Sequence, residues 1–233
     1  MKTSTYIATH SITLIERLAN SIKINDGVTA TVLAGAVCEA FLNDMQRFFQ
    51  HAADSKYETA KKSEEKDSAF KISKFEFDIN PFNLTTDLET KIAKTLLELD
   101  RFPTEKKYAA IIELLKGTNE SGDSRLQNLR NLFIIRNNIV HSKGLTLSIN
   151  YDGNDQKIPP TASDYPDFLR PLFKQKIIIL PKHNISWLYL LDTMQYCLWL
   201  KNTINNSMFY ILENLDEKSP VSNYFKESFY VYQ

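Results

Sequence analysis

The sequence predicts an all-α protein, a mostly up-and-down helical bundle with a small β-ribbon insertion. The chain of 233 residues has six glycines, which leaves long stretches without a helix breaker. Apolar residues recur at helical spacing over most of it. The exception is 145–182, where an alternating segment (145–150) and an Ile-rich segment (177–180) enclose a polar loop. The loop includes Pro159-Pro160, and the two flanking segments could pair as a two-stranded ribbon around an insertion.

The N-terminal third is predicted to hold the central packing element. Residues 4–23 have a helical period, and Asp26-Gly27 breaks the chain. Residues 28–62 then form one long helix whose first half is rich in Ala, Gly and Val. Small side chains allow another helix to approach closely, so we expect this helix to lie at the centre of the bundle.

The middle of the chain predicts shorter helices joined by turns. Thr85-Thr86-Asp87 is a suitable N-cap, and Ser124 is a candidate cap for a later helix. The predicted elements are an extended segment at 75–81 and helices at 88–99, 108–115 and 126–144.

The C-terminal part predicts a strongly apolar helix at 185–215, capped by Asn184, and an aromatic tail that docks as a short helix or binds a neighbour. We expect a single domain over 1–233. Its parts are a core of 4–144 and 184–215, an insertion at about 145–182 and a C-terminal tail at 216–233.

Composition limits the function classes. Lys and Arg total 28 and Asp and Glu total 28, so the chain is not globally basic and any RNA contact must be local. Cys38 and Cys197 lie in apolar helical settings and are predicted to be buried free thiols. The N-terminus lacks the apolar core of a signal sequence, and no run reaches roughly 18 apolar residues. We therefore expect a cytoplasmic protein with no membrane partner.

Known cofactor and metal patterns are not found in the sequence. The histidines have no metal-ligand spacing with one another or with the cysteines. The chain has no glycine-rich phosphate loop and no Gly-x-Ser-x-Gly elbow. We expect no metal and no cofactor.

The helix at 126–144 carries the most informative pattern. At about 3.6 residues per turn its apolar side chains form one stripe, and Arg136 falls in the middle of that stripe. Burial of an unpaired guanidinium costs several kcal/mol, so this face should meet a carboxylate, a phosphate or a partner subunit. The stripe consists of Leu129, Leu132, Phe133, Ile139 and Val140.

Two polar residues border the stripe. Asn137 and His141 are four residues apart, so they are neighbours on the helix surface, and the amide is predicted to orient the imidazole. With Arg136 they provide a fixed cation, an orienting amide and a proton carrier. These groups suit phosphodiester cleavage by the ribose 2′-hydroxyl, because charge develops on phosphate oxygens and protons must move at both ends.

The run from Arg136 to His141 resembles the Arg-polar-x-x-x-His signature of the HEPN superfamily. The small-residue helix at 32–44, which ends in Glu39-Ala-x-x-Asn43, is similar to one in large bacterial members. Lys106-Lys107-Tyr108, before the motif helix, is a weaker match.

The resemblance implies a metal-independent endoribonuclease that acts as a homodimer. Arg136 would contact the scissile phosphate, His141 would act as general acid or base, and Asn137 would orient the imidazole. The products would be a 2′,3′-cyclic phosphate and a 5′-hydroxyl. Members of the family commonly act as toxins or in antiviral defence, so an antitoxin or a defence-system protein is an expected partner beside RNA.

Further residues are candidates around this motif. Glu39 and Asn43, one helical turn apart, are predicted to line the same cavity as Arg136 and to support it, or Asn43 makes a helix–helix hydrogen bond. Arg130 and Lys143, and also Arg125, are candidates for contact with the RNA backbone, or they belong to a solvated face.

Two alternatives to the nuclease stay open. One is a non-catalytic HEPN module that binds nucleotide or a partner protein. The other is a helical interaction protein in which Arg136 forms a structural ion pair, for instance with Glu39. In some toxin pairs a nucleotidyltransferase antitoxin modifies a Tyr two residues after the motif His. Lys143 occupies that position here, which argues against this form of neutralisation.

Overall fold

The structure, a computed structural model, describes residues 9–61, 70–72, 75–77, 86–116, 122–141 and 159–230. Over these ranges it is predominantly helical, which confirms the predicted all-α class. The strands found there are β1 (Phe70–Ile72) and β2 (Phe75–Phe77), an antiparallel pair of three residues each. The predicted extended segment at 75–81 therefore begins as a strand, and its residues from 78 on lie outside the described ranges.

The predicted ribbon around the insertion is not supported. Residues 145–158 lie outside the described ranges, and 159–182 contains no strand. Ile177 and Ile178 are both buried. Successive side chains of a strand point to opposite faces, so two adjacent buried residues suit an irregular segment that packs on a core. The elements of this region are η2 (Ala162–Asp164), η3 (Asp167–Leu169) and α6 (Arg170–Lys174).

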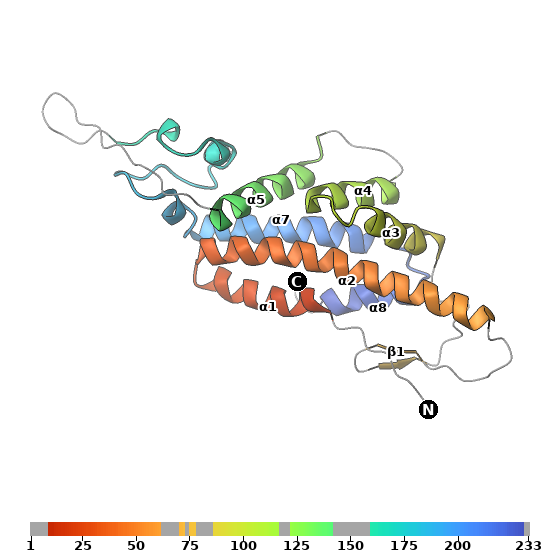
Figure 1. Cartoon of the computed structure of the whole chain (residues 1–233). Helices are drawn as coiled ribbons and strands as arrows, with labels where there is room; N and C mark the ends of the chain where they lie inside the picture. Colours follow the sequence, from red (N-terminus) through yellow and green to blue (C-terminus); the bar gives the residue numbers. More distant parts are fainter. Residues whose placement is uncertain are drawn as a thin grey trace, which may run out of the picture. The chain divides into compact units, whose positions relative to one another are not determined.

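The chain divides into two compact units, each built from segments distant in sequence. The first unit comprises residues 1–13, 37–122 and 207–233, and the second comprises 14–36 and 123–206. The helices that supply them are α1 (His10–Lys23), α2 (Gly27–Lys61), α3 (Asp87–Glu98), α4 (Thr104–Lys116), α5 (Ser124–Val140), α7 (Met194–Glu213) and α8 (Pro220–Tyr230) (Figure 1).

The core of the first unit is aromatic. Phe225 of α8 lies 5.6 Å from Phe41, 5.7 Å from Phe48 and 6.0 Å from Phe49, measured between ring centroids. All four rings are buried. These contacts confirm that the aromatic tail docks as a short helix, since it packs on α2 through its rings.

A buried carboxylate joins α3 to α8 in the same unit. Thr86 caps α3, and Glu89 completes a capping box by accepting a hydrogen bond from the Thr86 backbone N–H at 2.8 Å. Its other oxygen accepts hydrogen bonds from the hydroxyls of Ser219 and Ser222. The cap was predicted from the sequence, whereas the link to α8 was not.

The second unit contains the junction of α2 with the segment before α7. The predicted helix at 185–215 is interrupted, because η4 (Trp187–Leu190) ends before α7 begins at Met194. In the gap, the Asp192 carboxylate accepts hydrogen bonds from the backbone N–H groups of Gly27 (2.9 Å) and Val28 (3.4 Å). The carboxylate thus caps the N-terminus of α2.

Residues Gly27–Ala53 of α2 are long and apolar enough to cross a membrane by length and composition. Buried core helices of soluble proteins satisfy the same criterion. Cys38, in this segment, and Cys197 are buried free thiols, as predicted. Burial raises the pKa of Cys38 to about 12.

Candidate functional site

Arg136 lies near the end of α5 and is half-buried. Its side chain passes close to Gly35 of α2 in the second unit. A Cβ atom at Gly35 would lie 3.2 Å from Arg136 Cγ and 3.6 Å from Cδ and Nε. Gly35 therefore leaves room for the Arg136 stem, which is the kind of close approach that the small residues of this helix predict.

The guanidinium is held by its neighbour in sequence. Arg136 Nη1 donates a hydrogen bond of 3.1 Å to Asn137 Oδ1. The sequence predicts that this amide orients His141, but the structure gives its oxygen to Arg136. The physical reason is that a cationic donor makes the stronger hydrogen bond with an amide oxygen. The positioned pair in the structure is therefore Arg136–Asn137.

His141 is the C-cap of α5 and is exposed. Its backbone N–H donates to the Asn137 carbonyl at 3.0 Å, which fixes the backbone of the last turn. Within the described parts of the chain, the imidazole has no side-chain hydrogen bond. Its orientation by Asn137 stays a prediction.

The predicted apolar stripe of α5 divides into a buried and an exposed half. Leu129, Leu132 and Phe133 are buried, whereas Val140 is 50% exposed. A second row, with spacings of four, three and four residues, lies on the solvent side of the helix. Its members are the exposed residues Arg130, Ile134, Asn137 and His141.

The two predicted RNA contacts have different outcomes. Arg130 is exposed on the same row as His141, so it is accessible to a strand that approaches the motif. Lys143 lies outside the described residues. Arg125, at the other end of α5, is engaged in an ion pair with Asp123 at 2.5 Å.

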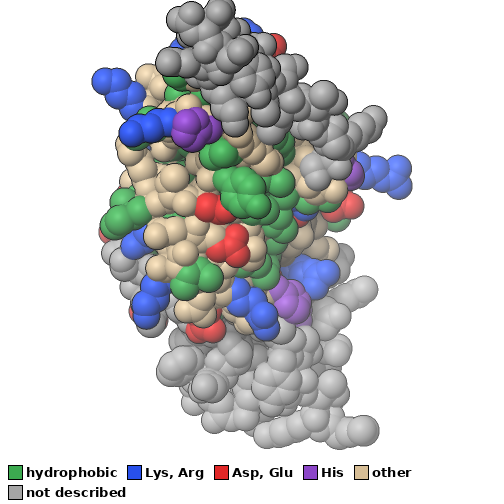
Figure 2. Space-filling view, turned by 90° about the vertical axis from the view of Figure 1, so that its left-hand side faces the viewer, with side chains coloured by type: hydrophobic (Ala, Val, Ile, Leu, Met, Phe, Trp, Pro, Cys, Tyr) green, Lys and Arg blue, Asp and Glu red, His purple; other side chains and the backbone are tan. Residues whose placement is uncertain are grey.

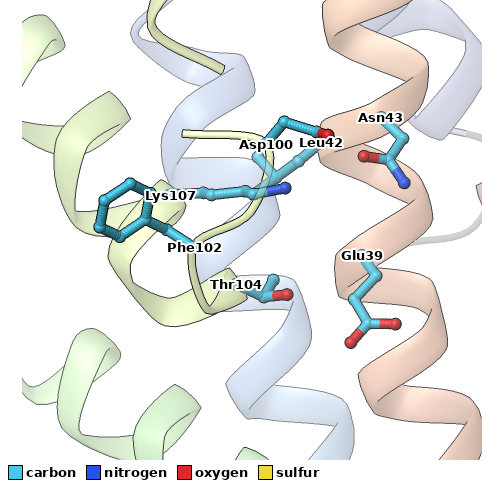
Figure 3. A pocket seen from close by; sticks show the side chains of 7 residues that line it. All are labelled: Glu39, Leu42, Asn43, Asp100, Phe102, Thr104 and Lys107. Atoms are coloured by element: carbon cyan, nitrogen blue, oxygen red, sulfur yellow. The ribbon is translucent and has the colours of Figure 1, made fainter. Parts of the chain in front are cut away.

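Glu39 and Asn43 line one cavity, in the first unit, whereas Arg136 belongs to the second. The cavity has a volume of about 290 Å³. Figure 3 shows the Lys107 ammonium directed from α4 toward the helix that carries Glu39 and Asn43. The remaining lining residues are Leu42, Asp100, Phe102 and Thr104.

Sequence reasoning missed most of this cavity. In the sequence, Asp100 and Thr104 fall in or beside a turn between two predicted helices, and no periodic pattern marks them. The sequence signal for these residues is the run Asp100–Thr104, a tight connection between two helices. Because both helices pack on the long helix, the connection must face it as well. Tyr108, by contrast, is a core residue, because it is fully buried and its hydroxyl donates to the Cys38 carbonyl at 3.4 Å.

Basic side chains do not gather on one patch of the face shown in Figure 2, where Lys and Arg stand at several separate places. Among the described residues, no group of three or more His, Cys, Asp or Glu side chains is arranged to hold a metal ion. Comparison of this chain with models of protein families, with characterised proteins and with solved structures finds no match.

Proposed function

We propose that this protein is a metal-independent endoribonuclease of HEPN type. The observation that supports it is the Arg136–Asn137 hydrogen bond beside an exposed His141, at the end of a helix whose solvent-facing row also carries Arg130. A cation held in one orientation near a proton carrier suits a reaction at a phosphodiester.

The proposed chemistry begins with attack by the ribose 2′-hydroxyl on the adjacent phosphorus. The P–O bond to the 5′-oxygen of the next nucleotide breaks, which leaves a 2′,3′-cyclic phosphate and a 5′-hydroxyl. Arg136 stabilises the negative charge that grows on the phosphate oxygens, and Asn137 holds the plane of its guanidinium. His141 removes the 2′-hydroxyl proton or donates a proton to the leaving oxygen.

One imidazole cannot perform both proton transfers in the same step. We therefore propose a homodimer in which the motifs of two copies form one cleft, so that one His141 is the base and the other the acid. The exposed apolar residues on α5, Ile134 and Val140, are 38% and 50% exposed and lie beside the motif, where such an interface would bury them.

The proposed biological role, a toxin or an antiviral-defence effector in the cytoplasm with an antitoxin or defence-system partner, rests on the resemblance alone.

Cleavage of labelled RNA in the presence of EDTA tests the proposal. We expect the chain to cleave single-stranded RNA, and His141→Ala to remove the activity by at least about a hundredfold, the usual scale for loss of a general acid or base. His183→Ala, which changes another exposed histidine of the same unit, is the matched control and should retain activity. Equal loss in both variants, or none in His141→Ala, contradicts the assignment.

The role of Asn137 is tested against its neighbour. Asn138 donates its side-chain amide to the Ile134 carbonyl at 2.8 Å, a bond within its own helix. Asn137→Ala should lower the cleavage rate because the guanidinium loses the hydrogen bond to the Asn137 oxygen, whereas Asn138→Ala should leave the rate unchanged. If both variants behave alike, Asn137 has no positioning role.

The cavity of the first unit favours the alternative, a non-catalytic module that binds a nucleotide. Lys107 is suited to a phosphate, and the carboxylates of Glu39 and Asp100 are suited to ribose hydroxyls. Titration with adenosine monophosphate, with Lys107→Ala as the variant, tests it. Binding that depends on Lys107, with no cleavage of any RNA, would favour this module over the nuclease.

A further inference from the structure

Exposed apolar side chains are frequent in the second unit between 179 and 198. A hydrogen bond of 2.7 Å from the Gln195 amide to the Lys176 carbonyl ties the segment before Ile179 to the first turn of α7. Met194 and Leu198, one turn apart, share a face of that helix. We call this set the apolar patch: Ile179 (73% exposed), Leu180 (40%), Tyr189 (67%), Met194 (66%) and Leu198 (42%).

The same stretch of the chain also carries exposed basic side chains. The exposed positive or protonatable residues of these segments are Lys174, Lys176, Lys182, His183 and Lys201.

Few acidic residues accompany these lysines. Asp167 pairs with Arg170 at 2.7 Å, and the exposed Asp192 carboxylate accepts hydrogen bonds from the N-terminus of α2. Residues 174–201 hold four lysines and one carboxylate, so this stretch is positively charged, although the chain as a whole has no net charge.

We infer that the apolar patch adsorbs to the surface of an anionic lipid membrane. Protruding Ile, Leu and Met side chains lose contact with water when they enter the boundary between headgroups and acyl chains, and Tyr is favoured at that depth. Lysine stems lie along apolar surface while their ammonium groups reach anionic headgroups. This adsorption requires no membrane-spanning segment. The expectation of no membrane partner rests on the lack of an apolar run long enough to span a membrane, so it does not exclude adsorption to a membrane surface.

Other occupants fit the observations less well. A second copy of the chain would bring two lysine-rich stretches face to face, and like charges oppose that contact. RNA would satisfy the lysines, but its phosphates offer nothing to Ile179, which is 73% exposed. An acidic protein partner with an apolar segment shares the required chemistry, and the lipid experiment separates it, because such a partner gives no affinity for vesicles.

Sedimentation of the intact chain with vesicles tests the inference without RNA, so its outcome is independent of the proposed nuclease. The probes are vesicles of phosphatidylcholine mixed with an equal part of phosphatidylglycerol, and vesicles of phosphatidylcholine alone. We expect binding to the mixed vesicles that falls as salt is raised, and weak binding to the neutral vesicles.

Matched variants separate this surface from general charge effects. Lys174→Glu with Lys182→Glu should weaken binding by at least about tenfold, since each lysine near an anionic surface contributes about fivefold. Lys91→Glu with Lys94→Glu, exposed positions on α3, changes the net charge equally and should have little effect. All four substitutions change exposed residues, and circular dichroism checks that the two double variants fold.

A second pair of variants tests the apolar contribution. Ile179→Asn should weaken binding to the mixed vesicles, whereas Leu97→Asn, at a position on α3 that is 53% exposed, should not. Absence of binding to the mixed vesicles overturns the inference. Equal losses in the two lysine pairs, or full binding by Ile179→Asn, also overturn it, because the patch would then not be the contact surface.

Discussion

Replacement of Gly35 by alanine tests how Arg136 is positioned. The added Cβ would lie 3.2 Å from Arg136 Cγ, closer than nine in ten Cβ contacts in proteins. The Arg136 side chain must then move by a few tenths of an ångström. Gly35 lies inside α2, where glycine is otherwise unfavourable, so its presence there is explained by the stem that passes over it.

Two opposing contributions set the expected size. Alanine in a helix interior is more favourable than glycine by about 0.5–1 kcal/mol. An extra methyl group in a well-packed site costs about 1–3 kcal/mol. We therefore expect Gly35→Ala to lower the free energy of unfolding by about 1 kcal/mol in the presence of Arg136. In an Arg136→Ala background, where the contacting Cγ, Cδ and Nε atoms are gone, the same change should raise it by about 0.5–1 kcal/mol.

Urea unfolding of the four proteins of this double-mutant cycle measures the coupling, which we expect to be about 1–2 kcal/mol. If Gly35→Ala stabilises both backgrounds equally, the proposed contact with the stem is refuted. Cleavage assays of the same proteins then ask whether displacement of the guanidinium matters. A shift of the phosphate-contacting group should reduce the rate by about tenfold or more even where stability is nearly unchanged.

Three further predictions concern stability. Gly27→Ala should lower the free energy of unfolding by at least about 3 kcal/mol, because its Cβ would lie 1.8 Å from the Leu191 carbonyl oxygen, which is backbone; a normal urea midpoint would show that this junction can move. Asp192→Ala should lower the free energy of unfolding by about 1–2 kcal/mol through loss of the α2 cap. Asp192→Asn can still accept those hydrogen bonds, so it should lower the free energy of unfolding by less. Equal losses in the two variants would exclude capping. Burial raises the pKa of Cys38 from its ordinary value of 9.0 to about 12, so the unfolded chain releases the thiol proton first and stability should fall as pH rises through that range. Cys38→Ala should remove part of this slope in pH-dependent unfolding, and an unchanged slope would contradict the burial.

The sequence by itself determined the helical class and much of the element order. A helix predicted at 28–62 occurs at Gly27–Lys61, and the cap predicted at 85–87 is the Thr86 cap of α3. The motif helix begins at Ser124, one residue after its Asp123 cap, although Ser124 had been expected as the cap itself. These features are local, because periodicity and capping depend on residues within a few positions of one another.

Tertiary structure alone decided the contacts between distant segments. The break before α7 arises because Asp192 caps a helix whose first residue is 165 positions away, and no local pattern encodes that bond. Spacing predicts His141 as the partner of Asn137, whereas the structure gives the Asn137 oxygen to Arg136, whose stem packs on Gly35. Exposure of Ile179 beside the buried Ile177 and Ile178 was equally invisible in an unbroken apolar run. Sequence periodicity reports which residues share a face, whereas burial depends on which other segment covers that face.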